Sequence, residues 1–217
     1  MIGDVNGRDP NNWPTASAMS VKKFFAAAGK HVIYFAGYGE LGYQDVNCVR
    51  RTALHVLTEL AAPSVLVHCG TLLRSDGNDG IAEVYAVAKE LGFETAGIHP
   101  SVARRFSSTH RVSPYCDHVF FVSDDTWGGF RQGTTIPSQT LSVHLAVSDE
   151  IIVIGGGKHA ADEMRAFMAI GKAVQYVPAE MNHATTREWC SRIGADLLDP
   201  RGAAHCAWDQ IRDQCIG

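Results

Sequence analysis

Short apolar runs alternate with amphipathic stretches along most of the chain. The runs are rich in β-branched and aromatic residues, and several end at glycine, which is typical of buried strands. We predict strands over 31–37, 64–70, 94–98, 118–122, 150–157, 173–177 and 195–198. Between them, apolar residues recur at helical spacing. They predict helices over 21–28, 46–60, 81–91, 139–147, 159–170, 185–193 and 203–214.

This alternation of strand and helix determines the expected fold class. Parallel neighbouring strands need crossover helices, and those helices must bury their apolar stripes on the sheet. We therefore predict an α/β fold: a Rossmann-like, doubly wound, mostly parallel sheet of about seven strands with helices on both faces. Residues 1–16, rich in Asn, Gly and Pro, are expected to be a flexible lead-in, and residues 17–217 a single nucleotide-binding domain.

Composition and charge narrow the range of partners. The chain has 217 residues, with 19 Lys and Arg against 23 Asp and Glu, and its positive residues are scattered. A dedicated nucleic-acid binder is therefore not expected, because such proteins collect basic residues on one face. No apolar run approaches the roughly 18 residues that span a bilayer, and the first residues are polar. We expect no membrane partner and a cytoplasmic location.

The first glycine-rich loop follows the strand predicted over 31–37. Gly37 and Gly39 open a GxGxxG pattern that also contains Glu40. This pattern raises the alternative of an NAD(P)-dependent dehydrogenase. However, the next helix is expected only near Asp45, and the next strand ends in 68–70 without the acidic residue that would hold a ribose. Gly37, Gly39 and Glu40 stay candidates for ligand binding, and no cofactor is predicted.

A second loop links the strand predicted over 64–70 to the helix that begins near residue 81. Gly70 ends the strand, and Asp79 and Gly80 precede the helix. A phosphate at this helix N-terminus, gripped by Arg74, is one interpretation. The other is that Asp79 simply caps the helix. Gly70, Arg74, Asp79 and Gly80 are therefore candidate ligand-binding residues.

The third loop carries the strongest signal. Gly156 and Gly157, next to Lys158 and His159, lie between a buried strand and a helix, and Glu163 follows about one turn inside that helix. Glycines let a ligand approach the backbone, and the helix N-terminus offers free N–H groups. We predict Glu163 as the catalytic residue, since its carboxylate could reach a ribose. Alternatively it is a solvent-facing acid favoured by the helix dipole. The histidines are dispersed, and no metal site is predicted.

Five short segments of the chain follow one another in the order found in a known family. They are Gly70, 79–82, 97–100, 148–150 and 155–163. With them, the stretch 31–178 resembles the SLOG superfamily of Rossmann-like nucleotide-binding proteins, including the LONELY GUY phosphoribohydrolases once labelled lysine decarboxylases. Glu163 with the segment 166–174 is also similar to the nucleoside deoxyribosyltransferases. The resemblance implies a homodimer whose glutamate acts near a ribose.

The residues and the resemblance lead to one main hypothesis. The chain binds a nucleotide or nucleoside-derived small molecule at the carboxyl ends of its strands, and Glu163 cleaves the N-glycosidic bond through an oxocarbenium-like transition state. The family's catalytic arginine, expected near 139–141, has no counterpart here. This favours the alternative, a non-catalytic sensor or carrier of a nucleotide derivative. A dehydrogenase is the third hypothesis.

Overall fold

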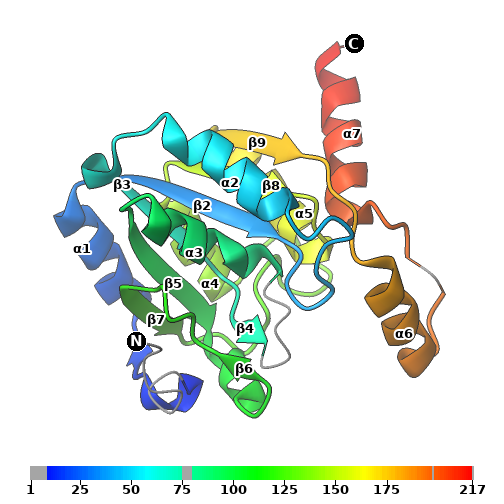
Figure 1. Cartoon of the computed structure of the whole chain (residues 1–217), viewed down its shortest axis with the longest axis horizontal. Helices are drawn as coiled ribbons and strands as arrows, with labels where there is room; N and C mark the ends of the chain where they lie inside the picture. The colour runs from blue at the N-terminus through cyan, green and yellow to red at the C-terminus, as the bar shows by residue number, and fades with distance from the viewer. Residues whose placement is uncertain (1–8, 75–79, 197, 217) are drawn as a thin grey trace.

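A seven-stranded sheet forms the centre of the computed structural model, which describes residues 9–74, 80–196 and 198–216 (Figure 1). In spatial order its strands are β1 (Thr15–Ala16), β7 (His118–Val122), β5 (Glu94–Pro100), β3 (Val65–Cys69), β2 (His31–Gly37), β8 (Glu150–Ile154) and β9 (Ala173–Val177). Each neighbouring pair is parallel. The predicted α/β, doubly wound parallel sheet is thus confirmed.

The strand order reverses once, between β2 and β8. From β2 the chain moves outward through β3 and β5 to β7, then returns to place β8 on the other side of β2, followed by β9. Gly37 at the end of β2 lies in register with Ile154 at the end of β8. The connections leaving these two strands run to opposite sides. In open α/β sheets, such a switch point opens a crevice at the carboxyl ends of the strands.

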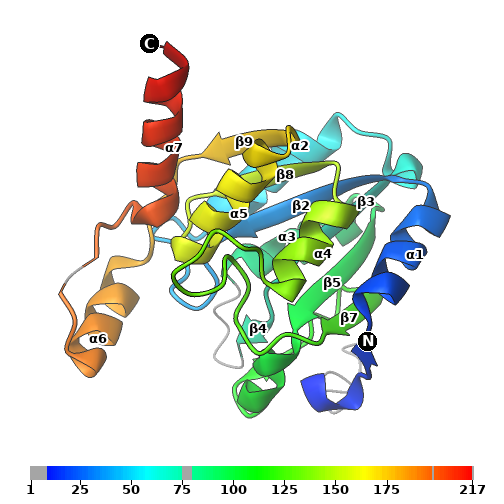
Figure 2. The same ribbon diagram turned by 180° about the vertical axis from the view of Figure 1, so that it is seen from behind.

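Helices cover both faces of the sheet (Figures 1 and 2). On one face lie α2 (Cys48–Thr58) and α3 (Glu83–Glu90), and on the other lie α1 (Ala18–Ala28), α4 (Gln139–Val147) and α5 (Lys158–Ala169). Alternate residues of β2 supply the two cores: Ile33 and Phe35 belong to the cluster around α2 and α3, and Tyr34 and Ala36 to the cluster around α5. No helix in the described part of the chain is long and apolar enough to cross a bilayer.

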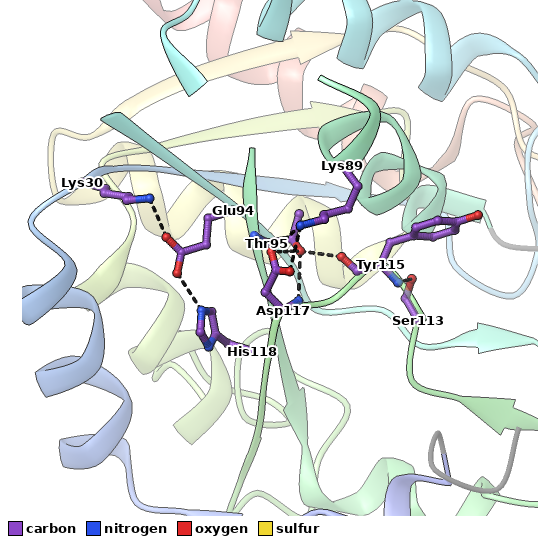
Figure 3. Close-up of polar contacts among 8 residues, drawn as sticks. All are labelled: Lys30, Lys89, Glu94, Thr95, Ser113, Tyr115, Asp117 and His118. Carbon is purple, nitrogen blue, oxygen red and sulfur yellow. Dashed lines mark hydrogen bonds and ion pairs between the residues drawn. The ribbon is translucent and has the colours of Figure 1, made fainter. Parts of the chain in front are cut away.

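Charged groups fasten the sheet at the amino ends of β5 and β7 (Figure 3). Glu94, the first residue of β5, accepts hydrogen bonds from Lys30 Nζ at 2.5 Å and from His118 Nε2 at 2.6 Å. Lys89 of α3 donates to Asp117, just before β7, at 2.8 Å. The bonds from Lys30 and His118 outweigh burial and lower the pKa of Glu94. These contacts lie at the amino ends of the strands, and the carboxyl ends lie at the opposite edge of the sheet.

The ends of the chain differ from the sequence-based expectations. Thr15–Ala16, expected in the lead-in, pairs with the end of β7, and residues 10–12 form a short 3-10 turn. Residues 1–8 lie outside the described part.

The predicted strand 195–198 is wrong. Helix α6 (His183–Ile193) ends at Gly194, the described residues that follow are irregular and exposed, and Leu197 is not described. Leu198 is 43% exposed, so its side chain is not buried against the sheet. The last helix, α7 (Gly202–Ile216), packs instead on α5.

Candidate functional site

A cavity of about 470 Å³ lies beside the switch point, at the carboxyl edge of the sheet. Its wall includes the ends of β2, β3 and β5 (Glu94–Pro100), the loop after β2, the loop before α4, and the first two turns of α4 and α5. Six of the residues predicted from sequence line it: Gly37, Gly39, Glu40, Gly70, His159 and Glu163. The fold therefore brings residues of all three glycine-rich loops to one place.

Other predicted residues lie elsewhere. Gly157 and Lys158 begin α5 beside the cavity but are not part of its wall. Gly80 and Gly156 are also outside the wall. Asp79 lies outside the described residues, as does the side chain of Arg74, whose backbone forms the short strand β4 (Leu73–Arg74).

Gly80 and Gly156 serve backbone packing. Gly80 has φ +52°, and a Cβ there would come within 2.4 Å of the Gly39 carbonyl oxygen. Gly156 has φ +121°, a Cβ there would lie 2.5 Å from Ala160 Cβ, and its carbonyl accepts from Ala204 N at 3.1 Å. Both positions need glycine because other chain segments touch them. The prediction that they contact a ligand gains no support from this packing.

The side chain of Tyr43 packs inside the GxGxxG loop. The Tyr43 hydroxyl accepts from the backbone N–H of Tyr38 at 3.0 Å and donates to the Ile154 carbonyl at 2.9 Å. It occupies the approach to Gly37, where an added Cβ would lie 2.1 Å from it. The next helix starts only at Cys48. This arrangement differs from a dinucleotide fingerprint, in which the loop backbone approaches the pyrophosphate directly.

Glu163 is the most strongly perturbed acid of the cavity. It lies on the second turn of α5, is only 7% exposed, and faces the Tyr34 hydroxyl, which hydrogen-bonds to it. Burial raises the pKa of the Glu163 carboxyl to about 8, the bond from Tyr34 opposes this, and the charge of Asp162 adds to it. Glu163 is therefore largely protonated at neutral pH and presents an uncharged carboxylic acid to the cavity.

Three aromatic rings stack behind Glu163. The ring of Tyr34 lies parallel to those of His144, at 4.3 Å, and His68, at 4.6 Å. Burial lowers the pKa of His144 to about 3 and that of His68 well below its ordinary value, so both rings are neutral near pH 7. His68 Nε2 lies 2.6 Å from Ser148 Oγ, whereas the neighbouring Cys69 belongs to the core on the other face. The side chains of His68 and Cys69 therefore lie on opposite faces of the sheet.

The mouth of the cavity is aromatic and polar. The rings of Trp127 and Phe106 lie 5.0 Å apart, and Trp127 is 43% exposed. His110 Nε2 lies 3.3 Å from Glu40 Oε1, and β6 (His110–Arg111) pairs with β4 to hold this histidine in place. The pair β4 and β6 is too short to show a periodic sequence signal.

The N-terminus of α5 also faces this mouth. Its N-cap residue, Gly157, has no side chain that could accept hydrogen bonds from the first amides of the helix. His159 and Ala160 of the first turn line the cavity. Among the described side chains of the wall, none is a lysine or an arginine. Positive potential at the described wall thus comes from the helix end rather than from a side-chain cation.

Tyr34, His144 and Thr140 were missed by the sequence analysis as lining residues. Tyr34 stands in an apolar run and His144 on an apolar helix, so both are typical of core positions. Trp127 lies in a Gly-rich loop, and that was the available signal for a side chain at the mouth.

No protein-family model and no curated protein matches the chain. Among solved structures it is similar to the Moco carrier protein from Chlamydomonas reinhardtii, at 17% identity over 85% of this chain and 99% of that one, with a TM-score of 0.47. It is also similar to TM1055, a structural genomics target, at 22% identity, 85% and 99% coverage and TM-score 0.48. The molybdenum cofactor binding protein from Rippkaea orientalis is 16% identical, with 87% and 98% coverage and TM-score 0.48.

Proposed function

We propose that the chain binds a nucleotide or nucleotide-derived small molecule in this cavity and carries or senses it without cleaving it. The observation that carries the proposal is a concave site at the switch point with an uncharged interior and a helix N-terminus at its mouth. Its volume of about 470 Å³ is within the range of small-molecule sites. A heterocycle suits the aromatic wall, and a phosphate suits the uncapped start of α5.

The protonation of Glu163 favours binding over hydrolysis. A glutamate that captures or stabilises an oxocarbenium ion must be ionised. The raised pKa of Glu163, about 8, keeps most of it protonated at neutral pH. No arginine stands among the described lining side chains to replace the family's catalytic one. N-glycosidic hydrolysis is the second candidate, and Glu163 would be mostly ionised for it only above about pH 8.

The test is a thermal-shift screen of the whole chain. Probes are the nucleoside monophosphates, NAD, ADP-ribose, cyclic nucleotides and the molybdenum cofactor, the molecule named for two of the solved structures above. A ligand at 100 times its dissociation constant adds about 2.7 kcal/mol of stability, which raises the Tm by roughly 5–10 °C at this size. Each binder is then incubated near pH 7 and near pH 9, and chromatography measures the released base.

The outcomes separate the candidates. A shift without base release at either pH supports the carrier or sensor. Base release that increases with pH and disappears in Glu163→Gln supports the hydrolase and overturns the non-catalytic proposal. Absence of a shift with every probe overturns both.

A further inference from the structure

The inner end of the cavity is formed by groups that carry no charge near pH 7. Gly70 lines it: a Cβ there would be 3.4 Å from His144 Nε2, 3.4 Å from the Ile98 carbonyl oxygen and 3.5 Å from the Tyr34 hydroxyl oxygen. Tyr34 in turn hydrogen-bonds to Glu163. The missing side chain of Gly70 therefore leaves space bordered by an imidazole, a phenol and a backbone carbonyl, and the carboxylic acid of Glu163 lines the same cavity.

The tautomer of His144 follows from its surroundings. Its Nδ1 is buried and has no hydrogen-bond partner among the described residues, whereas Nε2 is the nitrogen beside Gly70. A buried N–H without an acceptor is rarer than a buried acceptor without a donor. The proton is therefore assigned to Nε2, and His144 presents an N–H donor at the inner end of the cavity. The protonated carboxyl of Glu163 provides a second donor.

We propose that His144 and Glu163 recognise the heterocyclic ring of the ligand by donating hydrogen bonds to acceptors on it, so that the ring lies at the inner end and the phosphate at the mouth. This inference rests on the proposed function and assigns Glu163 to the base instead of the ribose. The expected ligand contains an uncharged heterocycle. The edge of this ring that faces the inner end of the cavity carries a keto oxygen or a ring nitrogen.

The reverse orientation is disfavoured by electrostatics. A phosphate at the inner end would be buried among neutral rings with no lysine or arginine in the described wall to pair with it. Burying an unpaired charge costs far more than burying a neutral ring whose polar atoms are hydrogen-bonded. At the mouth, the same phosphate keeps its hydration and meets the first amides of α5.

Isothermal titration at pH 7 tests the inference with AMP, GMP, CMP, UMP, the molybdenum cofactor and ribose 5-phosphate, which lacks a base. We expect the tightest heterocyclic probe to bind at least a hundredfold more tightly than ribose 5-phosphate. Equal binding of the two, within threefold, would overturn the inference and leave the proposed function standing. If neither these probes nor any probe of the thermal-shift screen binds the wild type, the proposed function itself fails.

Three variants then test the two donors. His144→Phe keeps the ring stacked on Tyr34 but removes the N–H, and should weaken the tightest heterocyclic probe about tenfold while leaving ribose 5-phosphate unchanged. Glu163→Gln keeps an N–H donor at the same place, and should change affinity less than threefold, whereas Glu163→Leu should lose about tenfold. The exposed Glu59→Gln is the matched control.

Two results would refute this assignment. A tenfold loss in Glu163→Gln would mean that a charged carboxylate is needed, and unchanged binding in His144→Phe would mean that the imidazole does not touch the ring. Circular dichroism and Tm of each variant show that it is folded.

Discussion

The buried carboxyl of Glu163 should make the stability of the protein fall as pH rises. In the unfolded chain this glutamate titrates near its ordinary value of 4.5, whereas burial raises the pKa in the folded protein to about 8. The folded state therefore holds a proton that the unfolded state releases. Its contribution to stability is fully present below about pH 4.5 and is lost progressively up to about pH 8.

The size of this loss follows from the shift. A difference of roughly 3.5 pKa units corresponds to about 5 kcal/mol, at 1.36 kcal/mol per unit. About 4 kcal/mol of it falls between about pH 5 and pH 8.5. Glu163→Gln removes the proton and keeps the shape and most of the hydrogen bonding. The free energy of unfolding of the variant minus that of the wild type should therefore increase by about 4 kcal/mol across this range.

Urea unfolding of both proteins at a series of pH values measures this difference. The buried histidines are common to the two proteins, so their titration cancels in the comparison. Glu59→Gln, an exposed change at the end of α2, should follow the wild type at every pH. A wild-type-to-Gln difference that varies by less than about 1 kcal/mol would refute the raised pKa and with it the uncharged carboxylic acid in the cavity.

Three further outcomes test the structure around the site. Tyr43→Phe leaves the Tyr38 N–H and the Ile154 carbonyl without their partner, and should lower the free energy of unfolding in urea by about 2–4 kcal/mol. Tyr115→Phe is the control, because this side chain is 48% exposed, and it should cost under about 0.5 kcal/mol. Neutral His144 contributes stability that is present above pH 6.5 and is lost as pH falls toward about 3. Between about pH 6.5 and 4.5, the free energy of unfolding of His144→Phe should therefore decrease by about 2 kcal/mol less than that of the wild type. Parallel acid-denaturation curves for the two proteins would contradict this. Gly80→Ala should cost more than about 2 kcal/mol because its Cβ meets backbone. Gly157→Ala, with open space and a negative φ, should cost under about 1 kcal/mol, the cost of alanine at an N-cap. Equal unfolding midpoints of the two variants would contradict the packing role of Gly80.

Much of the fold follows from local pattern. Short apolar runs rich in β-branched and aromatic residues predict strands, and the predicted 31–37, 118–122 and 173–177 coincide with β2, β7 and β9, although only β2 is buried along most of its length. The same rule failed over 195–198, because a short apolar run shows that a strand is possible and not that a sheet edge is there to pair with it. It also missed β1, whose two residues are too few to form a pattern.

The site was only partly visible in the sequence. Glycines after strands marked the edge of the sheet where the cavity lies, because parallel strands end together there. However, a glycine shows only that the backbone is approached closely, and the approaching group at Gly80 and Gly156 is the protein itself.

Tyr34 and His144, far apart in the chain, meet only because β8 returns beside β2 and brings α4 over the end of the sheet. The amino-acid sequence by itself thus determined the strands, the helices and the edge that carries the loops. Tertiary structure alone decided which side chains are desolvated together, and desolvation is what leaves Glu163 protonated and His144 neutral.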